Sequence, residues 1–142
     1  MFLESVVDRS MQQAYRETDF VIHGDVTITL NIGLANPTLV ELHKAHGVKF
    51  SGFVTACNPF SKAFDEAANF GRQAALADEL DRLDLVYLAG TGQHPSNKWP
   101  GEPSFLVLGL SREAARLIGM QYKQNAVVWC GLNAVPELVL LR

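Results

Sequence analysis

One carboxylate in an irregular part of the sequence is the strongest candidate for acid–base chemistry. Glu102 stands between Gly101 and Pro103, just before an apolar run that begins at Ser104. A carboxylate in this position could exchange a proton with a ligand or accept hydrogen bonds from it. It could equally accept hydrogen bonds only from amides of its own loop. We predict Glu102 as the catalytic residue and Ser104 as one of the ligand-binding residues.

The segment before Glu102 offers a flat side chain for ligand binding. Residues 90–103 contain glycines, prolines, a histidine and Trp99 with almost no periodicity, which predicts the longest loop of the chain. Long loops in compact domains often bind ligands or close over them. Trp99 could stack on a ring, or it could cover an edge of the core. The glycines do not form a dinucleotide fingerprint, because the third one is missing and Pro95 interrupts the expected helix.

Polar residues also gather where the apolar stretch 50–57 ends. Thr55, Asn58 and Ser61 would lie at the carboxyl end of a buried strand, which is where ligands bind in open α/β sheets. A helix is expected to start near Ser61, and its free N–H groups would attract a phosphate or carboxylate. Capping of that helix by Asn58 or Ser61, with Pro59 in its first turn, explains the same residues without a ligand and is the favoured interpretation.

Two further groups could recognise a ligand. Gln124 and Asn125 precede an apolar strand, and their amides offer donors and acceptors suited to a base edge or a sugar. Alternatively, Asn125 could adopt the left-handed conformation of a turn. Arg72 follows Asn69 by three residues on an expected helix and is the best anion-binding candidate, although a surface ion pair is the more common role.

Cysteines and histidines give little support for a nucleophile or a metal site. Cys57 and Cys130 lack a Cys-x-x-Cys spacing, which indicates free thiols in a reducing compartment. Cys57 has no histidine base placed near it by the sequence, so a small buried side chain is the favoured interpretation. His43 and His46 could share a helix face, yet no third metal ligand is evident and a solvated surface is favoured. We predict no metal and no cofactor.

Composition limits the possible partners. The net charge is -3 and the 12 Lys and Arg residues are scattered, so nucleic acid is an unlikely partner. No apolar run reaches the roughly 18 residues that a membrane span needs. The N-terminus carries acids and lacks the basic start of a secretory signal. We therefore expect a cytoplasmic protein without a membrane partner.

The spacing of apolar residues predicts four helices. From Leu3 onward, apolar residues recur about every fourth position, which predicts a helix that ends near Glu17. Thr38 and Glu41 have capping-box spacing, so a short helix should begin at Thr38 and end at Gly47. A longer helix over 60–80 would approach the sheet through small side chains, namely Ala67, Ala68, Gly71, Ala74 and Ala75. A helix over 111–118 would be capped by Ser111 and ended by Gly119.

Short apolar or alternating runs predict the strands. They cover 20–22, 26–32, 50–57, 85–89, 104–108, 126–130 and 138–141. Gly24 is expected to supply a positive φ in a hairpin between the first two. The run 50–57 is apolar at nearly every position, which is typical of a strand buried on both faces. The whole pattern predicts one α/β or α+β domain over residues 1–142, with a mixed central sheet flanked by helices and the strand 50–57 near its centre.

Three motifs in this order carry a family resemblance. They are FVTACNPFS at 53–61, GEPSF at 101–105 and QNAVVW at 124–129, and Tyr15 followed by Phe20 resembles the start of the same pattern. Together they resemble the DUF3293 family over most of the chain. The resemblance implies a small, single-domain bacterial protein and brings no activity with it. It also implies a variable residue at position 57, which argues against catalysis by Cys57.

If the three motifs lie at one rim of the sheet, they form a single polar pocket. This expectation fails if Asn58, Glu102 and Asn125 lie on separate surfaces. The first functional hypothesis is a small-molecule enzyme or ligand-binding protein, with a ligand that is phosphorylated or nucleotide-like. The second is a non-catalytic module that binds a protein partner through an exposed strand or the opening helix.

Overall fold

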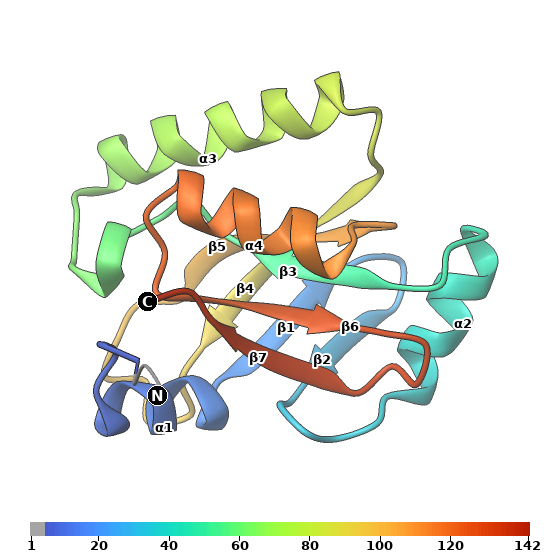
Figure 1. Cartoon of the computed structure of the whole chain (residues 1–142), viewed down its shortest axis with the longest axis horizontal. Helices are drawn as coiled ribbons and strands as arrows, with labels where there is room; N and C mark the ends of the chain where they lie inside the picture. Colours follow the sequence, from blue (N-terminus) through green and yellow to red (C-terminus); the bar gives the residue numbers. More distant parts are fainter. Residues whose placement is uncertain (1–4) are drawn as a thin grey trace, which may run out of the picture.

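The computed structural model describes residues 5–142, which form four α-helices and a curled sheet of seven strands (Figure 1). The helices are α1 (Arg9–Glu17), α2 (Pro37–Ala45), α3 (Glu66–Arg82) and α4 (Arg112–Gln121), and a short 3-10 turn spans Pro59–Ser61. The strands are β1 (Asp19–His23), β2 (Thr27–Leu30), β3 (Ser51–Val54), β4 (Tyr87–Gln93), β5 (Glu102–Leu108), β6 (Ala126–Cys130) and β7 (Pro136–Leu140). Their order in the sheet is β2-β1-β4-β5-β3-β6-β7.

The expected α+β fold is confirmed, but the expectation of a mixed sheet is wrong. Every pairing between neighbouring strands is antiparallel. The reason lies in the connections between strands. Three strands pair with the strand that follows them in the chain, namely β1 with β2, β4 with β5 and β6 with β7. The helices α2, α3 and α4 each link strands that are not neighbours in the sheet. The two strands joined by α3 run parallel to one another, as do the two joined by α4, but an antiparallel strand lies between the members of each pair. No hydrogen-bonded parallel pair is therefore formed among the described strands.

Alternation along the interior strands builds a core on each face of the sheet. Phe53 and Leu106 belong to the core on the α2 side, whereas Val54 and Val107 belong to the core under α3 and α4. Because successive side chains of a strand point to opposite faces, one short strand contributes to both cores. All four residues of β3 are buried, and the strand lies between β5 and β6, one place from the middle of the sheet. The prediction of an interior strand buried on both faces is confirmed.

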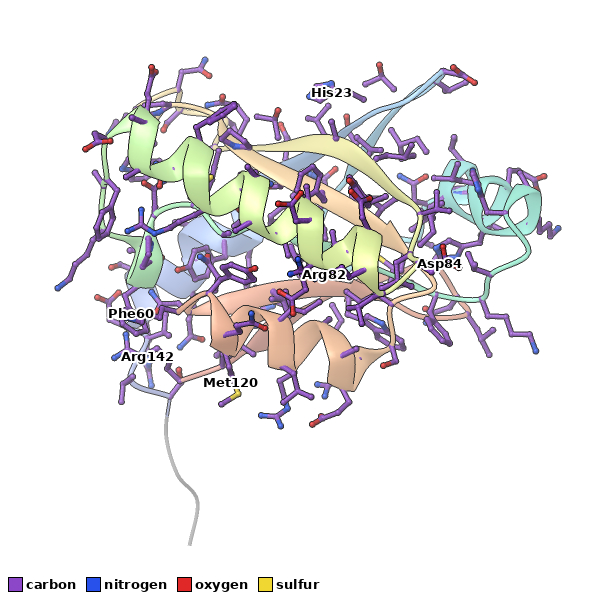
Figure 2. The ribbon with its side chains drawn as sticks, turned by 90° about the horizontal axis from the view of Figure 1, so that it is seen from above. His23, Phe60, Arg82, Asp84, Met120 and Arg142 are labelled. Carbon is purple, nitrogen blue, oxygen red and sulfur yellow. The ribbon has the colours of Figure 1, made fainter. Side chains whose placement is uncertain are left out.

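The helix α3 is the largest departure from the expected elements. It begins at Glu66, capped by the Asp65 side chain, instead of near Phe60. Figure 2 shows α3 and α4 side by side over one face of the sheet. Only the second half of α3 packs there, through Leu76 and Leu80, which are fully buried. The small side chains expected against the sheet are mostly exposed, and these are Ala67, Gly71, Ala74 and Ala75.

The boundaries of the other helices follow from their caps. Asp8 caps α1, so the helix starts later than expected, and Leu3 lies outside the described residues. Asn36 caps α2, with Thr38 inside the helix. Ser111 caps α4 as predicted, but the helix continues past Gly119 to Gln121.

Three of the predicted glycine roles can be compared with the backbone. Gly47 takes the expected positive φ of 65° after α2, whereas Gly24 is not among the residues with positive φ. Gly119 does not end α4, because it lies where a Cβ would stand 2.7 Å from Cγ1 of Val127. Its lack of a side chain therefore allows the helix to approach β6 closely.

We predict that Gly90→Ala destabilises the fold, because a Cβ at this position in β4 would lie 2.7 Å from Cε2 of Phe53 and 2.8 Å from the carbonyl oxygen of Val21. Overpacking of this kind should lower the free energy of unfolding by about 1–3 kcal/mol. Gly71→Ala on α3 is the matched control, since nothing lies within 4 Å of its Cβ position. Chemical denaturation should show the control at or slightly above wild-type stability. Equal stability of Gly90→Ala and wild type would contradict the packing.

Candidate functional site

A cavity of about 930 Å³ opens at one end of the sheet. It lies under the first half of α3, beside α1 and the loop 94–101, and against the ends of β3, β5 and β6. Figure 1 shows α1, the turn before α3 and the β4–β5 loop gathered at this same end. Eight residues predicted as site residues line it, namely Thr55, Asn58, Ser61, Trp99, Glu102, Ser104, Gln124 and Asn125. Their common location meets the condition for a single pocket, whereas their roles in binding stay predictions.

Asn58 connects three segments at the cavity wall. Its Nδ2 donates to Oε2 of Glu102 at 2.9 Å, and its Oδ1 accepts from the backbone N–H of Phe64 at 3.0 Å. Asn58 and Asn69 also bind one another, because the Asn58 N–H donates to Asn69 Oδ1 at 2.9 Å and Asn69 Nδ2 donates to Asn58 Oδ1 at 2.8 Å. Asn58 has a left-handed backbone with φ of 49°, a conformation that asparagine tolerates better than most residues. It does not cap a helix with its side chain.

Glu102 occupies the first position of β5, opposite Gly92 of β4, so it belongs to a strand and not to the expected loop. The loop itself is shortened to residues 94–101 because β4 continues through Gln93. Burial raises the pKa of Glu102 to about 7, and the hydrogen bond from Asn58 opposes that rise. Oε2 accepts from Asn58, whereas Oε1 accepts no hydrogen bond from the described residues. A carboxyl group with this pKa can gain or lose a proton near neutral pH.

Gln73 is a site residue that the sequence analysis missed. Its Oε1 accepts from the backbone N–H of Ala56 at 3.0 Å, while its buried Nε2 has no partner among the described residues. Thr55 donates to the carbonyl oxygen of Pro103 at 2.7 Å and so joins the end of β3 to the start of β5. Cys57 is buried, and burial raises the pKa of its thiol. This agrees with the interpretation of Cys57 as a small buried side chain.

Ser61 lies in a second polar cluster at the same cavity. Its hydroxyl binds that of Tyr15 and accepts from Asn125 Nδ2 at 3.0 Å. The expected helix start at Ser61 is wrong, because α3 begins five residues later and Ser61 has a positive φ of 60°. Asn125 is also not in the left-handed conformation, which Lys123 adopts instead. A helix dipole therefore does not support an anion site at Ser61.

The amide of Gln124 holds the neighbouring backbone in place. Gln124 is buried and its Nε2 donates to the carbonyl oxygen of Cys57 at 2.9 Å. Asn125 accepts a hydrogen bond from the Arg142 guanidinium at 3.1 Å. These contacts tie the start of β6 to the turn that precedes α3.

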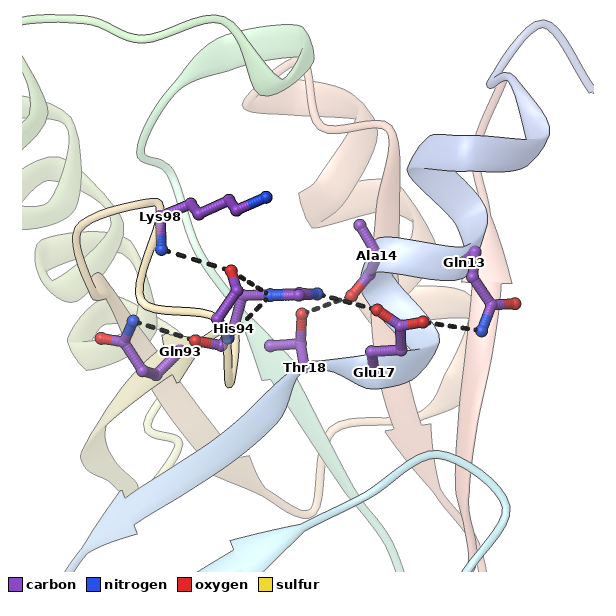
Figure 3. A network of polar contacts seen from close by, with 8 residues as sticks. Gln13, Ala14, Glu17, Thr18, Gln93, His94 and Lys98 are labelled. Carbon is purple, nitrogen blue, oxygen red and sulfur yellow. Dashed lines mark hydrogen bonds and ion pairs between the residues drawn. The ribbon is translucent and has the colours of Figure 1, made fainter.

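A histidine that the sequence analysis did not select fastens the loop to α1 (Figure 3). His94 Nε2 binds Oε2 of Glu17 at 2.9 Å, and its Nδ1 accepts from the backbone N–H of Ser96 at 3.2 Å. The Trp99 ring meets His94 edge to face, with 4.7 Å between centroids. Trp99 is 53% exposed, so it lies at the mouth of the cavity and does not cover the core. His94 acquires this role from its contact with Glu17 of α1, which is distant in the chain, and a single sequence does not reveal that contact.

Arg72 is the one predicted site residue that does not line the cavity. Its guanidinium lies over the ring of Phe64 at 4.5 Å, and its Nη1 is buried without a hydrogen-bond partner among the described residues. The surface ion pair expected for Arg72 is not found in residues 5–142. A cation over an aromatic face gains from the electron density of the ring, which accounts for the position.

The solvated surface expected for His43 and His46 is found only for His46, which is exposed directly after α2. His43 is buried and its Nε2 lies 2.8 Å from the Ser51 hydroxyl. Among residues 5–142, no group of three His, Cys, Asp or Glu side chains is placed to hold a metal ion. The same part of the chain has no helix that is both long and apolar enough to cross a bilayer.

Comparison with known proteins identifies a family without assigning chemistry. Residues 54–127, slightly more than half of the chain, match the family described as a protein of unknown function (DUF3293). The matched segment runs from the end of β3 to the start of β6 and includes Asn58, Glu102 and Asn125. No curated protein and no solved structure matches the chain.

We predict that Glu102→Gln makes the protein more stable at about pH 8. The folded-state pKa of Glu102, about 7, lies above the ordinary value of 4.5, so the native state holds this proton more tightly than the unfolded chain does. The resulting stability is present at low pH and is lost as the pH rises from about 4.5 to about 7. Glutamine has no charge to bury, so the free energy of unfolding of the variant should exceed that of the wild type by on the order of 2 kcal/mol at this pH.

Denaturant titrations at two pH values measure this effect. The advantage of Glu102→Gln should shrink to less than half at about pH 5, where the native carboxyl is protonated. Glu41→Gln, on the exposed surface of α2, is the control and should show no such pH dependence. An advantage of the same size at both pH values would mean that Glu102 is not destabilised by its surroundings.

Proposed function

The chain belongs to the DUF3293 family, and we propose that it binds a small organic molecule in the cavity, with Glu102 as the group that exchanges a proton with it. The observation that carries this proposal is the placement of Glu102 beside a cavity of about 930 Å³, with one carboxyl oxygen that has no hydrogen-bond partner in the described part of the chain. Pockets of this size accept ligands the size of a metabolite. A carboxyl group with a strongly shifted pKa in such a pocket is a candidate for function.

Glu102 has the properties of a general acid–base group. With a pKa of about 7, both protonation states are populated at neutral pH. Asn58 donates to one oxygen and fixes the plane of the carboxyl group, so the other oxygen is presented in a defined direction. Asn58 is itself held by Asn69 and by the backbone of Phe64. This second layer of hydrogen bonds is the support that a positioned catalytic group requires.

The ligand is expected to have a substantial apolar part. Aromatic side chains contribute to several walls of the cavity, and they include Phe20, Phe53, Phe64, Phe70, Trp99 and Phe105. Phe70 and Trp99 are largely exposed at 78% and 53%. Exposed aromatic side chains beside a concave pocket suit a ligand that completes their burial.

The expectation of a phosphate or other anion on the ligand loses the two features that supported it. The helix start expected at Ser61 lies elsewhere, and Arg72 stacks on Phe64 outside the cavity lining. Among the described residues, the lining contains no Lys or Arg. A phosphate would therefore enter without the cationic partner that usually binds it.

The alternative of a non-catalytic protein-binding module remains a prediction. A bacterial origin and a cytoplasmic location, both expected from the sequence, also remain predictions. No observation on the described residues favours a protein partner over a small molecule. The two functions differ in whether binding of the partner requires the cavity.

A thermal-shift screen with a library of metabolites tests the proposal. We expect at least one compound to raise the Tm of the wild type, since a ligand that binds only the native state stabilises it. Ala74→Phe should abolish this response, because Ala74 lines the cavity beneath α3. Ala75→Phe is the matched control, since it is an exposed neighbour on α3 outside the lining and should retain the response. Glu102→Gln should weaken binding by about tenfold or more.

Two results would overturn the proposal. One is a ligand that stabilises Ala74→Phe as well as wild type, which would place binding outside the cavity. The other is the absence of any stabilising compound together with a protein that co-purifies equally with wild type and Ala74→Phe. The second result would favour the protein-binding module.

A further inference from the structure

The cavity lining carries carboxylates, while Arg72 and Arg142 contact lining residues from outside it. Glu66 and Glu102 line it, and among the described residues no Lys or Arg does. His94 also lines the cavity, but its Nε2 is already engaged with Glu17. A ligand therefore enters a cavity whose described lining carries carboxylates and neither Lys nor Arg. Such a field favours a positive ligand over a negative one.

Glu102 lacks a cation among the described residues. Within residues 5–142, the one hydrogen bond to its carboxyl group comes from the neutral amide of Asn58, and no ion pair is formed with that group. An ionised carboxylate that leaves water without an opposite charge loses much of its solvation energy. A bound ligand that brings a positive charge to Oε1 would restore that energy. A neutral ligand would restore only part of it.

Aromatic rings provide a second set of contacts for a positive ligand. Phe20 and Phe53 meet edge to face with 5.3 Å between centroids, and both line the cavity. The ring of Phe64 already accepts the Arg72 guanidinium at 4.5 Å. Cations are attracted to aromatic faces, and several such rings around one site form the cage that binds organic ammonium ions.

We propose that the ligand is an organic amine in its ammonium form, carried on an apolar or aromatic body. Its N–H groups donate to Oε1 of Glu102, and its apolar body lies along the aromatic walls. This inference rests on the proposed function, since it names the chemical class of the molecule bound in the same cavity. The assignment also predicts which ligands are rejected. A carboxylate ligand would be repelled by Glu102, and an alcohol would leave the charge of Glu102 unbalanced.

Matched sets of probes test this inference. Each set shares one apolar body and differs in the head group, which is an ammonium, a hydroxyl or a carboxylate. The sets are phenethylamine, phenethyl alcohol and hydrocinnamate; tryptamine, tryptophol and indolepropionate; and hexylamine, hexanol and heptanoate. Calorimetric or thermal-shift titration at about pH 8, where Glu102 is ionised, should give the amine of the best-binding set an affinity about tenfold or more above its alcohol.

Variants of the two lining carboxylates locate the effect. Glu102→Gln keeps the size and the hydrogen bond to Asn58 but removes the charge, so the amine should fall to the affinity of the alcohol. Glu66→Gln, at the exposed start of α3, should change the preference by less than about threefold because water screens its charge. Glu41→Gln lies outside the cavity and should change nothing.

The preference for the amine should also depend on pH. Lowering the pH from about 8 to about 5 protonates Glu102 and should remove most of the preference. The other titratable or charged groups on or beside the cavity are Tyr15, Glu17, Cys57, Glu66, Arg72, His94 and Arg142. Comparison with Glu102→Gln separates their contribution, since the variant should show no preference at either pH.

The outcomes distinguish this inference from the proposed function. If an alcohol or carboxylate binds as well as its matched amine and Ala74→Phe prevents binding, the cavity is a ligand site but the amine assignment is wrong. If amines are preferred and Glu102→Gln retains that preference, Glu102 is not the recognising group and the inference also fails. If no probe of any set and no metabolite binds, both this inference and the proposed function fail.

Discussion

A pair of amides, Asn58 and Asn69, is the constraint on which the site depends. Their reciprocal hydrogen bonds join the turn after β3 to the first half of α3, and the remaining donor of Asn58 reaches Glu102 at the start of β5. The left-handed backbone of Asn58 directs the chain away from the sheet before α3 begins. The helix is thereby displaced to Glu66, and the cavity lies beneath its first half. Each amide binds both backbone and side chain, so the loss of either one would leave several buried polar groups without partners.

The stability of the molecule lies mainly away from this cavity. Leu106 and Val107 place one strand in both cores, and Leu76 and Leu80 anchor the second half of α3. These apolar contacts can offset the cost of burying the carboxyl group of Glu102, because they are made by other residues. The arrangement is typical of proteins in which a rigid sheet positions polar groups at one edge.

The sequence analysis predicted local features better than long-range ones. The interior burial of β3, the Ser111 cap and the bounds of β6 follow from apolar patterning and side-chain capping, which act within a few residues. The antiparallel sheet was missed because its pattern depends on the order in which the hairpins lie side by side in the sheet, and this order is set by contacts distant in the chain. The start of α3 was missed because three residues of the turn, Asn58, Phe60 and Ser61, adopt positive φ in place of helical values. In the site, eight lining residues were selected by type and position, whereas Gln73 and His94 acquire their roles only from partners distant in the chain.

The uneven anchoring of α3 has a consequence for how the molecule opens. Its second half is held by buried leucines, while its first half covers a cavity and is held chiefly by hydrogen bonds. Local unfolding free energy should therefore rise along the helix from Glu66 towards Arg82, with the amide protons of the first turns exchanging soonest. A fluctuation of these turns would open the cavity and leave both cores intact. The covering helix is thus anchored at its C-terminal end, and bending of its N-terminal end would be enough to open the cavity.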